Sequence, residues 1–326
     1  MLMKNPVRIF LMLALTTLVS VPFLADEFYL DLFTNLMIMG IFAMSLDLLI
    51  GYTGLVSFGH AAFFGLTGYL LAIVTPESAA LSIWISLPVA LIGAALAALV
   101  IGWFSVRTSG VYFIMITLAF AQMMYYYFNE NNDLGGSDGM FIFTKPLVYL
   151  GNFEIIDLSN PVNVYFLVFV SLIGSYFLLK QILKAPFGQV IQAIRVNEHR
   201  TRALGYNTQN YKLVAFVIAG TLAGFAGYLE AMSTGIVSPG SLNWHESGLV
   251  MMLVILGGMG TLYGPVIGAF VLGMLHDQVQ ELTEYWLLVQ GVFVILIVIF
   301  MPKGIAGLVA SLSPRGSRKN LDTGDD

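Results

Sequence analysis

Long apolar runs follow one another through most of this chain, and they constrain its fold more than any other feature. Hydrophobic residues make up 58% of the 326 residues, whereas only 10% are charged. Soluble domains contain about 25% charged residues, so this composition excludes an ordinary soluble fold. Within lipid, an apolar segment satisfies its own backbone polar groups only as a helix. We therefore predict an all-α polytopic membrane protein.

The apolar runs also predict where the membrane-spanning helices lie. Nine stretches qualify: 8–25, 31–50, 55–74, 81–104, 111–128, 164–183, 211–232, 246–275 and 285–301. The stretch 55–74 is rich in glycine, so we expect its helix to be tilted or discontinuous. The first stretch follows Lys4 and Arg8 and could be a cleaved signal peptide. We expect residues 1–25 to be retained instead, because the run is long and lacks a clear cleavage site.

Charged residues predict which side of the membrane each loop faces. Lys and Arg residues gather in the segment 180–212, whereas the loop at about 129–163 is mostly acidic. The positive-inside rule places the first in the cytoplasm and the second in the periplasm. A single crossing by 246–275 would put the basic C-terminal tail outside, but a break at the glycines of 257–265 allows two short crossings. We therefore expect about ten membrane segments within residues 1–306, both termini cytoplasmic, and a flexible cytoplasmic tail at 307–326.

The basic segment has the pattern of a short amphipathic helix. Pro186 suits the first helical turn, and Gly205 suits a left-handed stop. One side carries an apolar stripe made of Phe187, Val190, Ile191 and Ile194. On the other side, Arg195 and His199 share a face with Arg202, which can pair with Glu198 four residues before it. Periodicity alone fits a helix on anionic lipid and a helix bound by another protein equally well.

Two glycine-interrupted segments resemble each other: 51–65 and 260–273. Paired segments of this kind indicate a solute path near the membrane midplane, although glycines also let helices pack closely. Asp47 precedes the first segment, and we interpret it as a hydrated anchor near the cytoplasmic end in preference to a functional carboxylate. The residues expected along the path are Asp47, Gly54, Ser57, Phe58, Gly59, His60, Gly257, Gly258, Gly260 and Gly264.

Motifs for catalysis and nucleotide binding are absent from the sequence. There is no Gly-x-x-x-x-Gly-Lys-Ser/Thr loop, no His-Glu-x-x-His, no Gly-x-Ser-x-Gly and no cysteine. The histidines are scattered without metal-ligand spacing, at His60, His199, His245 and His276. We therefore expect a chain that is not an enzyme, with no catalytic residue, no metal site and no cofactor of its own.

Four stretches together resemble the LivM-type family of ABC importer permeases, which carry branched-chain amino acids and include urea and amide transporters. They are 51–63, 193–205, 223–227 and 256–265, and Met301-Pro302-Lys303-Gly304 matches the family's ending. The resemblance covers about residues 30–305 and implies the ABC importer transmembrane fold in a bacterial inner membrane. Its coupling loop, about 184–210, is implied to enter a cytoplasmic ATPase. The implied contact residues are Arg195, Asn197, Glu198, Arg202, Ala203 and Gly205. Asp47 departs from the family, where an uncharged residue such as Asn is expected.

The resemblance also implies partners. We expect two cytoplasmic ATPase subunits that bind ATP and Mg, a second related permease subunit, a periplasmic solute-binding protein and membrane lipid, but no nucleic acid. The loops 129–163 and 233–247 are the outer surfaces on which the binding protein could dock. Branched-chain amino acids are the expected solutes, with urea or short amides as the alternative within the family. An ion-coupled secondary transporter, using Asp47 and Glu230, is the alternative from another class.

Overall fold

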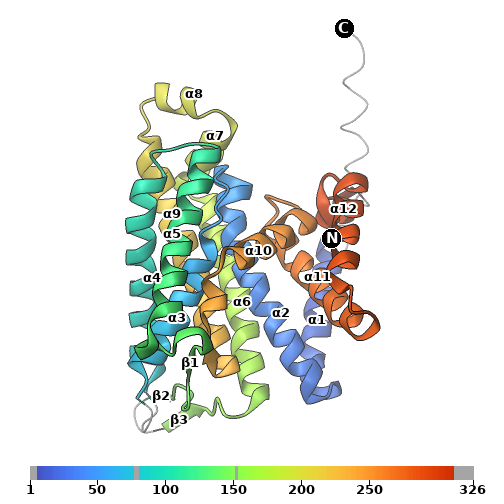
Figure 1. Ribbon diagram of the computed structural model, residues 1–326. Helices are drawn as coiled ribbons and strands as arrows, with labels where there is room; N and C mark the ends of the chain where they lie inside the picture. The colour runs from blue at the N-terminus through green and yellow to red at the C-terminus, as the bar shows by residue number, and fades with distance from the viewer. Residues whose placement is uncertain (1–5, 77–80, 151–152, 312–326) are drawn as a thin grey trace.

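The computed structural model describes residues 6–76, 81–150 and 153–311, and it is a bundle of helices (Figure 1). Within the described residues, ten helices have 14 to 27 residues. They are α1 (Pro6–Leu24), α2 (Glu27–Asp47), α3 (His60–Val74), α4 (Ile83–Ser105), α5 (Val111–Glu130), α6 (Pro161–Lys184), α9 (Thr208–Thr234), α10 (Trp244–Gly257), α11 (Tyr263–Leu282) and α12 (Trp286–Phe300). The predicted helical fold is therefore confirmed.

Six helical segments in the described part of the chain are long and apolar enough to cross a membrane. They are Glu27–Thr53, Ile83–Ser105, Val111–Glu130, Pro161–Lys184, Thr208–Thr234 and Trp286–Leu308. Shorter apolar helices occur at Ala14–Phe23, His60–Val74 and Trp244–Gly257. The chain is thus a multi-pass membrane protein, whereas the number of about ten crossings and the side of each terminus stay predictions.

Helix α2 lies at the centre of the bundle. It packs against α6, α9, α10 and α11, and 83% of its most apolar window is buried. In the most apolar part of the segment Trp286–Leu308, which contains α12, only 11% is buried, and the exposed residues are apolar. A helix that is apolar all round suits the interior, whereas an apolar exposed face suits lipid. At its C-terminal end, α2 continues as the π-helix η1 (Leu48–Thr53).

The two long loops lie at opposite ends of the bundle (Figure 1). One end carries 3-10 turns (Asn132–Leu134, Gly136–Asp138 and, later in the chain, Pro239–Leu242) and two small sheets. Strand β1 (Met140–Phe141) pairs with β4 (Ile236–Val237), and β2 (Val148–Leu150) pairs with β3 (Phe153–Ile156). The other end carries α7 (Pro186–Val196) and α8 (Glu198–Ala203). This separation agrees with the opposite sides predicted for these loops.

The region 246–275 reverses direction, as its glycines predicted. Helices α10 and α11 are antiparallel neighbours, because Gly257 lies against Gly264 and Gly268 lies against Leu253. The connecting residues 258–262 include positive φ angles at Gly258 and Gly260, and also at Leu262. A glycine adopts such angles without strain, whereas leucine does so rarely. The predicted break in place of one continuous helix is therefore confirmed, whereas two crossings of the membrane stay a prediction.

The prediction of one helix from Pro186 to Gly205 is wrong, because the chain forms two helices there. Asn197 is extended, with φ −159° and ψ 99°, and its Oδ1 accepts a hydrogen bond of 2.9 Å from the Arg200 N–H. Asparagine side chains favour such caps over the helix interior, so α8 begins anew at Glu198. The predicted start at Pro186 and the left-handed Gly205, with φ 92°, are both confirmed.

Helix α13 (Gly304–Ser311) follows α12 after a short turn. The boundary expected between residues 306 and 307 therefore falls inside a helix. Residues 312–326 lie outside the described residues, and so the rest of the predicted tail stays a prediction. Residues 1–5 lie outside them as well. Helix α1 packs on α6, where the Tyr165 hydroxyl donates a 2.7 Å hydrogen bond to the Leu18 carbonyl.

Candidate functional site

Asp47 ends α2, and its carboxylate binds the turn between α10 and α11. Its Oδ1 accepts a hydrogen bond of 2.7 Å from the Gly260 N–H, and its Oδ2 accepts one of 3.3 Å from the Leu262 N–H. Asp47 is fully buried. The interpretation as a hydrated anchor is therefore wrong. The turn needs such an acceptor because residues 258–262 have left the helical hydrogen-bond ladder.

Arg195 extends from the last turn of α7 to the π-helix that follows α2. Its guanidinium donates a hydrogen bond to the Gly51 carbonyl oxygen. Gly51 in turn lies against Gly260, since a Cβ atom added to Gly51 would be 2.5 Å from the Gly260 nitrogen. A Cβ atom on Gly260 would lie 3.3 Å from Arg195 Nη1. The two glycine-interrupted segments thus meet through backbone atoms, and Arg195 contacts both.

Residues 54–59 attach the beginning of α3 to α5. Gly54 is exposed and left-handed, with φ 79°, and it ends the π-helix. The Ser57 hydroxyl accepts a 3.3 Å hydrogen bond from the Gly59 N–H, while the Phe58 N–H donates a 3.3 Å bond to Thr117 Oγ1. A Cβ atom on Gly59 would lie 3.0 Å from the Thr117 carbonyl carbon. These contacts favour a packing role for Gly59, and its place on a solute path stays a prediction.

His60 is the first residue of α3 and is fully buried. Its Nε2 forms a 2.9 Å hydrogen bond with Ser45 Oγ, and its ring stacks on Phe42 with centroids 5.8 Å apart. Its Nδ1 has no hydrogen-bond partner among the described residues. That part of the chain also contains no group of three His, Cys, Asp or Glu side chains able to hold a metal ion. His60 therefore joins α3 to α2 in the core.

Glu198 joins α8 to the beginning of α9. Its carboxylate forms ion pairs of 2.5 Å with Lys212 and 3.2 Å with Arg202, and it accepts a 3.0 Å hydrogen bond from Thr208 Oγ1. Burial alone raises the pKa of Glu198, but the Lys212 ammonium and the Thr208 hydroxyl outweigh it and hold the pKa below its usual value. The pair with Arg202 was predicted from spacing. The contact with Lys212 was not predicted, although Lys212 is a charged residue at the start of the apolar run 211–232.

The tip of the α7–α8 segment exposes apolar side chains. Val196 is 85% exposed and Leu204 is 73% exposed, and Ala203 and Gly205 beside Leu204 are exposed as well. Asn197 is exposed between the two helices. Sequence reasoning did not single out Val196 or Leu204, although both lie within the segment that it identified. The two exposed apolar side chains lie at the ends of these short helices, Val196 at the end of α7 and Leu204 directly after α8.

The apolar stripe of α7 is not available for such a contact. Val190, Ile191 and Ile194 are buried. Phe187 is half-buried and stacks on Tyr211 of α9, with ring centroids 5.8 Å apart. The stripe therefore packs inside the protein. This arrangement disfavours a helix that lies with its apolar face in lipid.

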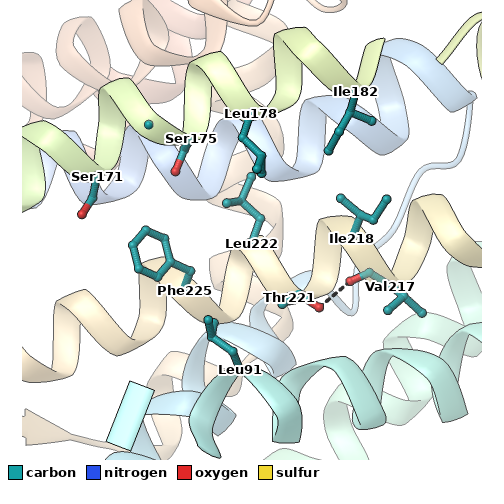
Figure 2. A pocket seen from close by; sticks show the side chains of 11 residues that line it. Leu91, Ser171, Ser175, Leu178, Ile182, Val217, Ile218, Thr221, Leu222 and Phe225 are labelled. Atoms are coloured by element: carbon teal, nitrogen blue, oxygen red, sulfur yellow. Dashed lines mark hydrogen bonds between the residues drawn. The ribbon is translucent and has the colours of Figure 1, made fainter. Parts of the chain in front are cut away.

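Two apolar cavities lie between the helices. A cavity of about 520 Å³ lies between α4, α6 and α9, and one of about 430 Å³ lies between α1, α2, α6 and α11. Figure 2 shows the first, where the Thr221 hydroxyl turns back to the Val217 carbonyl of its own helix, 2.7 Å away. The lining of this cavity is consequently almost entirely apolar. None of the expected path residues lines either cavity.

Comparisons with known proteins identify the family of the chain. Residues 28–298 match the protein family described as branched-chain amino acid transport system, permease component. The high-affinity branched-chain amino acid transport system permease protein LivM of Escherichia coli K12 is 30% identical over 317 residues, covering 91% of this chain and 74% of that protein. LivM of Salmonella typhimurium matches to the same extent.

Sugar permeases match less closely. The ribose import permease protein RbsC of Haemophilus influenzae is 22% identical over 91% of each chain. No solved structure matches the chain. The family match covers most of the residues that the structure describes, and the relatives named here are permease proteins of transport systems. The chain therefore belongs to the branched-chain amino acid permease family of ABC transporters.

Proposed function

We propose that this chain is the membrane-spanning subunit of an ATP-driven importer of branched-chain amino acids in a bacterial inner membrane. The observation that carries this proposal is the 30% identity to LivM over 91% of the chain. The matches to RbsC favour ribose or a related sugar as a second candidate solute. Urea and short amides are further candidate solutes, because the family that the chain resembles includes their transporters.

The α7–α8 segment is the surface proposed to receive an ATPase subunit. It lies at one end of the bundle, its apolar stripe is already buried, and its tip exposes Val196 and Leu204 (Figure 1). Energy from ATP has to come from a partner, because this chain has no phosphate-binding loop. The proposed complex contains two ATPase subunits that bind ATP and Mg, and a second related permease chain.

A solute-binding protein is proposed to dock at the opposite end, which carries the β1–β4 and β2–β3 sheets. The solute would then pass between outward-open and inward-open states of the permease. The ion-coupled alternative is less well supported. Both carboxylate oxygens of Asp47 bind backbone N–H groups and are thus engaged in holding the α10–α11 turn.

Uptake by whole cells tests the solute and the energy source. Cells with the gene deleted, and cells with it restored, are given radiolabelled leucine, urea or ribose. We expect restoration to recover leucine uptake, and ATP depletion to abolish it while an uncoupler leaves most of it. Recovery of urea uptake alone, or of ribose uptake alone, would mean that this compound is the solute instead of leucine. Uptake that survives ATP depletion and collapses with an uncoupler would contradict an ATP-driven importer.

The partner contact is tested by purification from the native membrane. Val196→Asp and Leu204→Asp place charges at the exposed tip, and we expect them to reduce the ATPase protein that copurifies with the tagged chain. Leu282→Asp is the matched control, since Leu282 is 82% exposed at the far end of α11. An ATPase that copurifies equally with all three variants would exclude the tip as the contact.

A further inference from the structure

Helix α7 contacts the rest of the protein through Arg195 at a place where two parts of the chain far apart in sequence meet. We name this place the glycine junction and define it by Asp47, Gly51, Arg195, Gly260 and Leu262. Asp47 and Gly260 are separated by 213 residues, and Arg195 and Gly51 by 144. The junction therefore ties α7, the end of α2 and the α10–α11 turn together.

The α10–α11 turn depends on Asp47 at this junction. Both carboxylate oxygens accept backbone N–H groups of the turn, at 2.7 Å from Gly260 and 3.3 Å from Leu262. Asp47 is fully buried, so water does not replace it readily. Leu262 holds a φ of 52°, an unusual angle for a residue with a side chain. Contacts around the turn must maintain this conformation.

Arg195 connects the junction to α7. Its guanidinium donates to the Gly51 carbonyl, and its charge also interacts with that of Asp47. A Cβ atom on Gly54 would lie 3.3 Å from Arg195 Cγ, so the side chain also lies against the end of the π-helix. Gly51 lies against both the Gly260 nitrogen and the Asp47 carboxylate, and neither glycine position has room for a side chain. A displacement of α7 therefore acts on both glycine-interrupted segments through Arg195.

We propose that Asp47 and Arg195 are positioning residues that transmit movement of α7 to the α10–α11 turn. In this role Arg195 acts inside the permease and is not a direct ATPase contact, while Asp47 holds the turn and is not a solute ligand. The inference rests on the proposed function, in which the α7–α8 segment receives the ATPase. It adds the route by which that movement enters the membrane-embedded helices.

The coupling test compares transport with ATP hydrolysis. The whole complex, carrying Asp47→Asn, Arg195→Gln or Arg195→Lys, is reconstituted in liposomes, and leucine uptake and ATP hydrolysis are measured on the same sample. We expect uptake per ATP to fall by about tenfold or more in Asp47→Asn and Arg195→Gln, as loss of a charged hydrogen bond predicts. ATP hydrolysis should persist. Arg107→Gln, on the α4–α5 connection, is the control and should keep the normal ratio.

Three results would overturn the proposal. The first is an unchanged ratio in both Asp47→Asn and Arg195→Gln. The second is equal loss of uptake and hydrolysis because the ATPase no longer binds, which would make Arg195 a direct contact. The third is a raised KM for leucine at a normal ratio, which would make Asp47 a solute ligand. If Asp47→Asn does not accumulate in the membrane, the two Arg195 variants decide the outcome.

A cross-linking test of the junction needs neither ATP nor solute. The chain has no cysteine, so a pair introduced by Gly54→Cys and Arg195→Cys is the only thiol pair. A Cβ atom on Gly54 would lie 3.7 Å from Arg195 Cβ, close to the spacing of about 3.8 Å in disulfides. We expect oxidation to join this pair but not Gly54→Cys with Val196→Cys, since Val196 is 85% exposed.

The two tests separate failure of the inference from failure of the proposed function. Absence of the cross-link would show that α7 does not lie on the junction, and the inference would fail while the importer could still work. If the cross-link forms but uptake never depends on ATP, the contact between α7 and the junction is confirmed. The ATP-independent uptake would contradict the proposed function and with it the coupling role.

Discussion

Two breaks in the helices, residues 48–59 and 258–262, overlap the glycine-interrupted segments 51–65 and 260–273 and satisfy their backbone groups in different ways. The first remains largely hydrogen-bonded to itself: Thr53 Oγ1 donates to the Leu48 carbonyl at 2.9 Å, and the Leu55 N–H donates to the Leu49 carbonyl at 2.9 Å. The second has two N–H groups that bind Asp47, a residue of the other half of the chain. Similar glycine patterns therefore produce one break that bonds mostly within itself, apart from Arg195 and Thr117, and one whose N–H groups depend on a distant carboxylate.

This difference is also visible in the backbone angles. The first segment has one positive φ, at Gly54, whereas the second has them at Gly258, Gly260 and Leu262. Each such angle in a residue with a side chain costs about 1–2 kcal/mol, so the second segment needs more support from its surroundings. The comparison teaches that internal similarity in sequence does not imply equal roles in the structure. It also ranks the effects of substitutions in the two segments.

The largest effect is expected where the second segment begins. Gly257→Val would place a side chain against the Gly264 carbonyl and 2.9 Å from the Pro265 nitrogen. Because backbone cannot move aside as a side chain does, we expect a loss of about 3 kcal/mol or more of stability, or no folded protein. Thermal unfolding in detergent, followed by tryptophan fluorescence, measures it. Gly291→Val on α12 is the control, since nothing lies within 4 Å of that position.

A smaller, graded effect is expected in the first segment. Gly59→Ala would press against the Thr117 backbone and should cost about 1–3 kcal/mol. Gly54→Ala has more room, its nearest neighbour being Arg195 Cγ at 3.3 Å, and should cost about 1–2 kcal/mol through its φ of 79° alone. Chemical denaturation in detergent compares the two. A greater loss in Gly54→Ala would mean that backbone angle outweighs packing in this segment.

The smallest effect is expected from removing a local hydrogen bond. Thr53→Val keeps the shape of the buried side chain but deletes the bond to the Leu48 carbonyl, and it should cost about 1 kcal/mol. The same denaturation experiment on Thr34→Val provides the reference, because Thr34 is also buried and bonds within α2. A loss of several kcal/mol in Thr53→Val alone would show that this local bond supports the first segment more than the packing around it does.

Much of the fold could be predicted from the sequence because each membrane helix is marked by a continuous run of apolar residues. Apolar runs located the long helices, the glycines of 257–265 located the reversal between α10 and α11, and Pro186 and Gly205 marked the ends of the basic segment. These features depend on residues close together in the chain. Which of the described helices cross the membrane, and in which direction, depends on the lipid as well.

The contacts of the candidate site could not be predicted in the same way. Asp47 and Gly260 meet only through the packing of α2 on α10 and α11, and no spacing rule connects them. The break at Asn197 was missed because its neighbours continue a helical pattern, while its side chain caps the next helix. From the sequence, Lys212 was counted only as one of the positive charges of the segment 180–212. Its burial, at 5% exposure, follows from the fold of α8 back onto α9.

The ion pair between Glu198 and Lys212 fixes how the basic segment is joined to the rest of the molecule. Because the pKa of Glu198 is held below its usual value, the stabilisation from this pair is complete above the unfolded carboxyl's pKa and disappears only as pH falls through the lowered one. Near neutral pH the pair is therefore intact, and at this joint α8 stays attached to α9. Helix α9 has 27 residues and is thus roughly 40 Å long, and it leads directly into strand β4. A single helix therefore connects the end of the bundle that carries α7 and α8 to the end that carries the β1–β4 sheet, so a tilt of one end along this line moves the other as well.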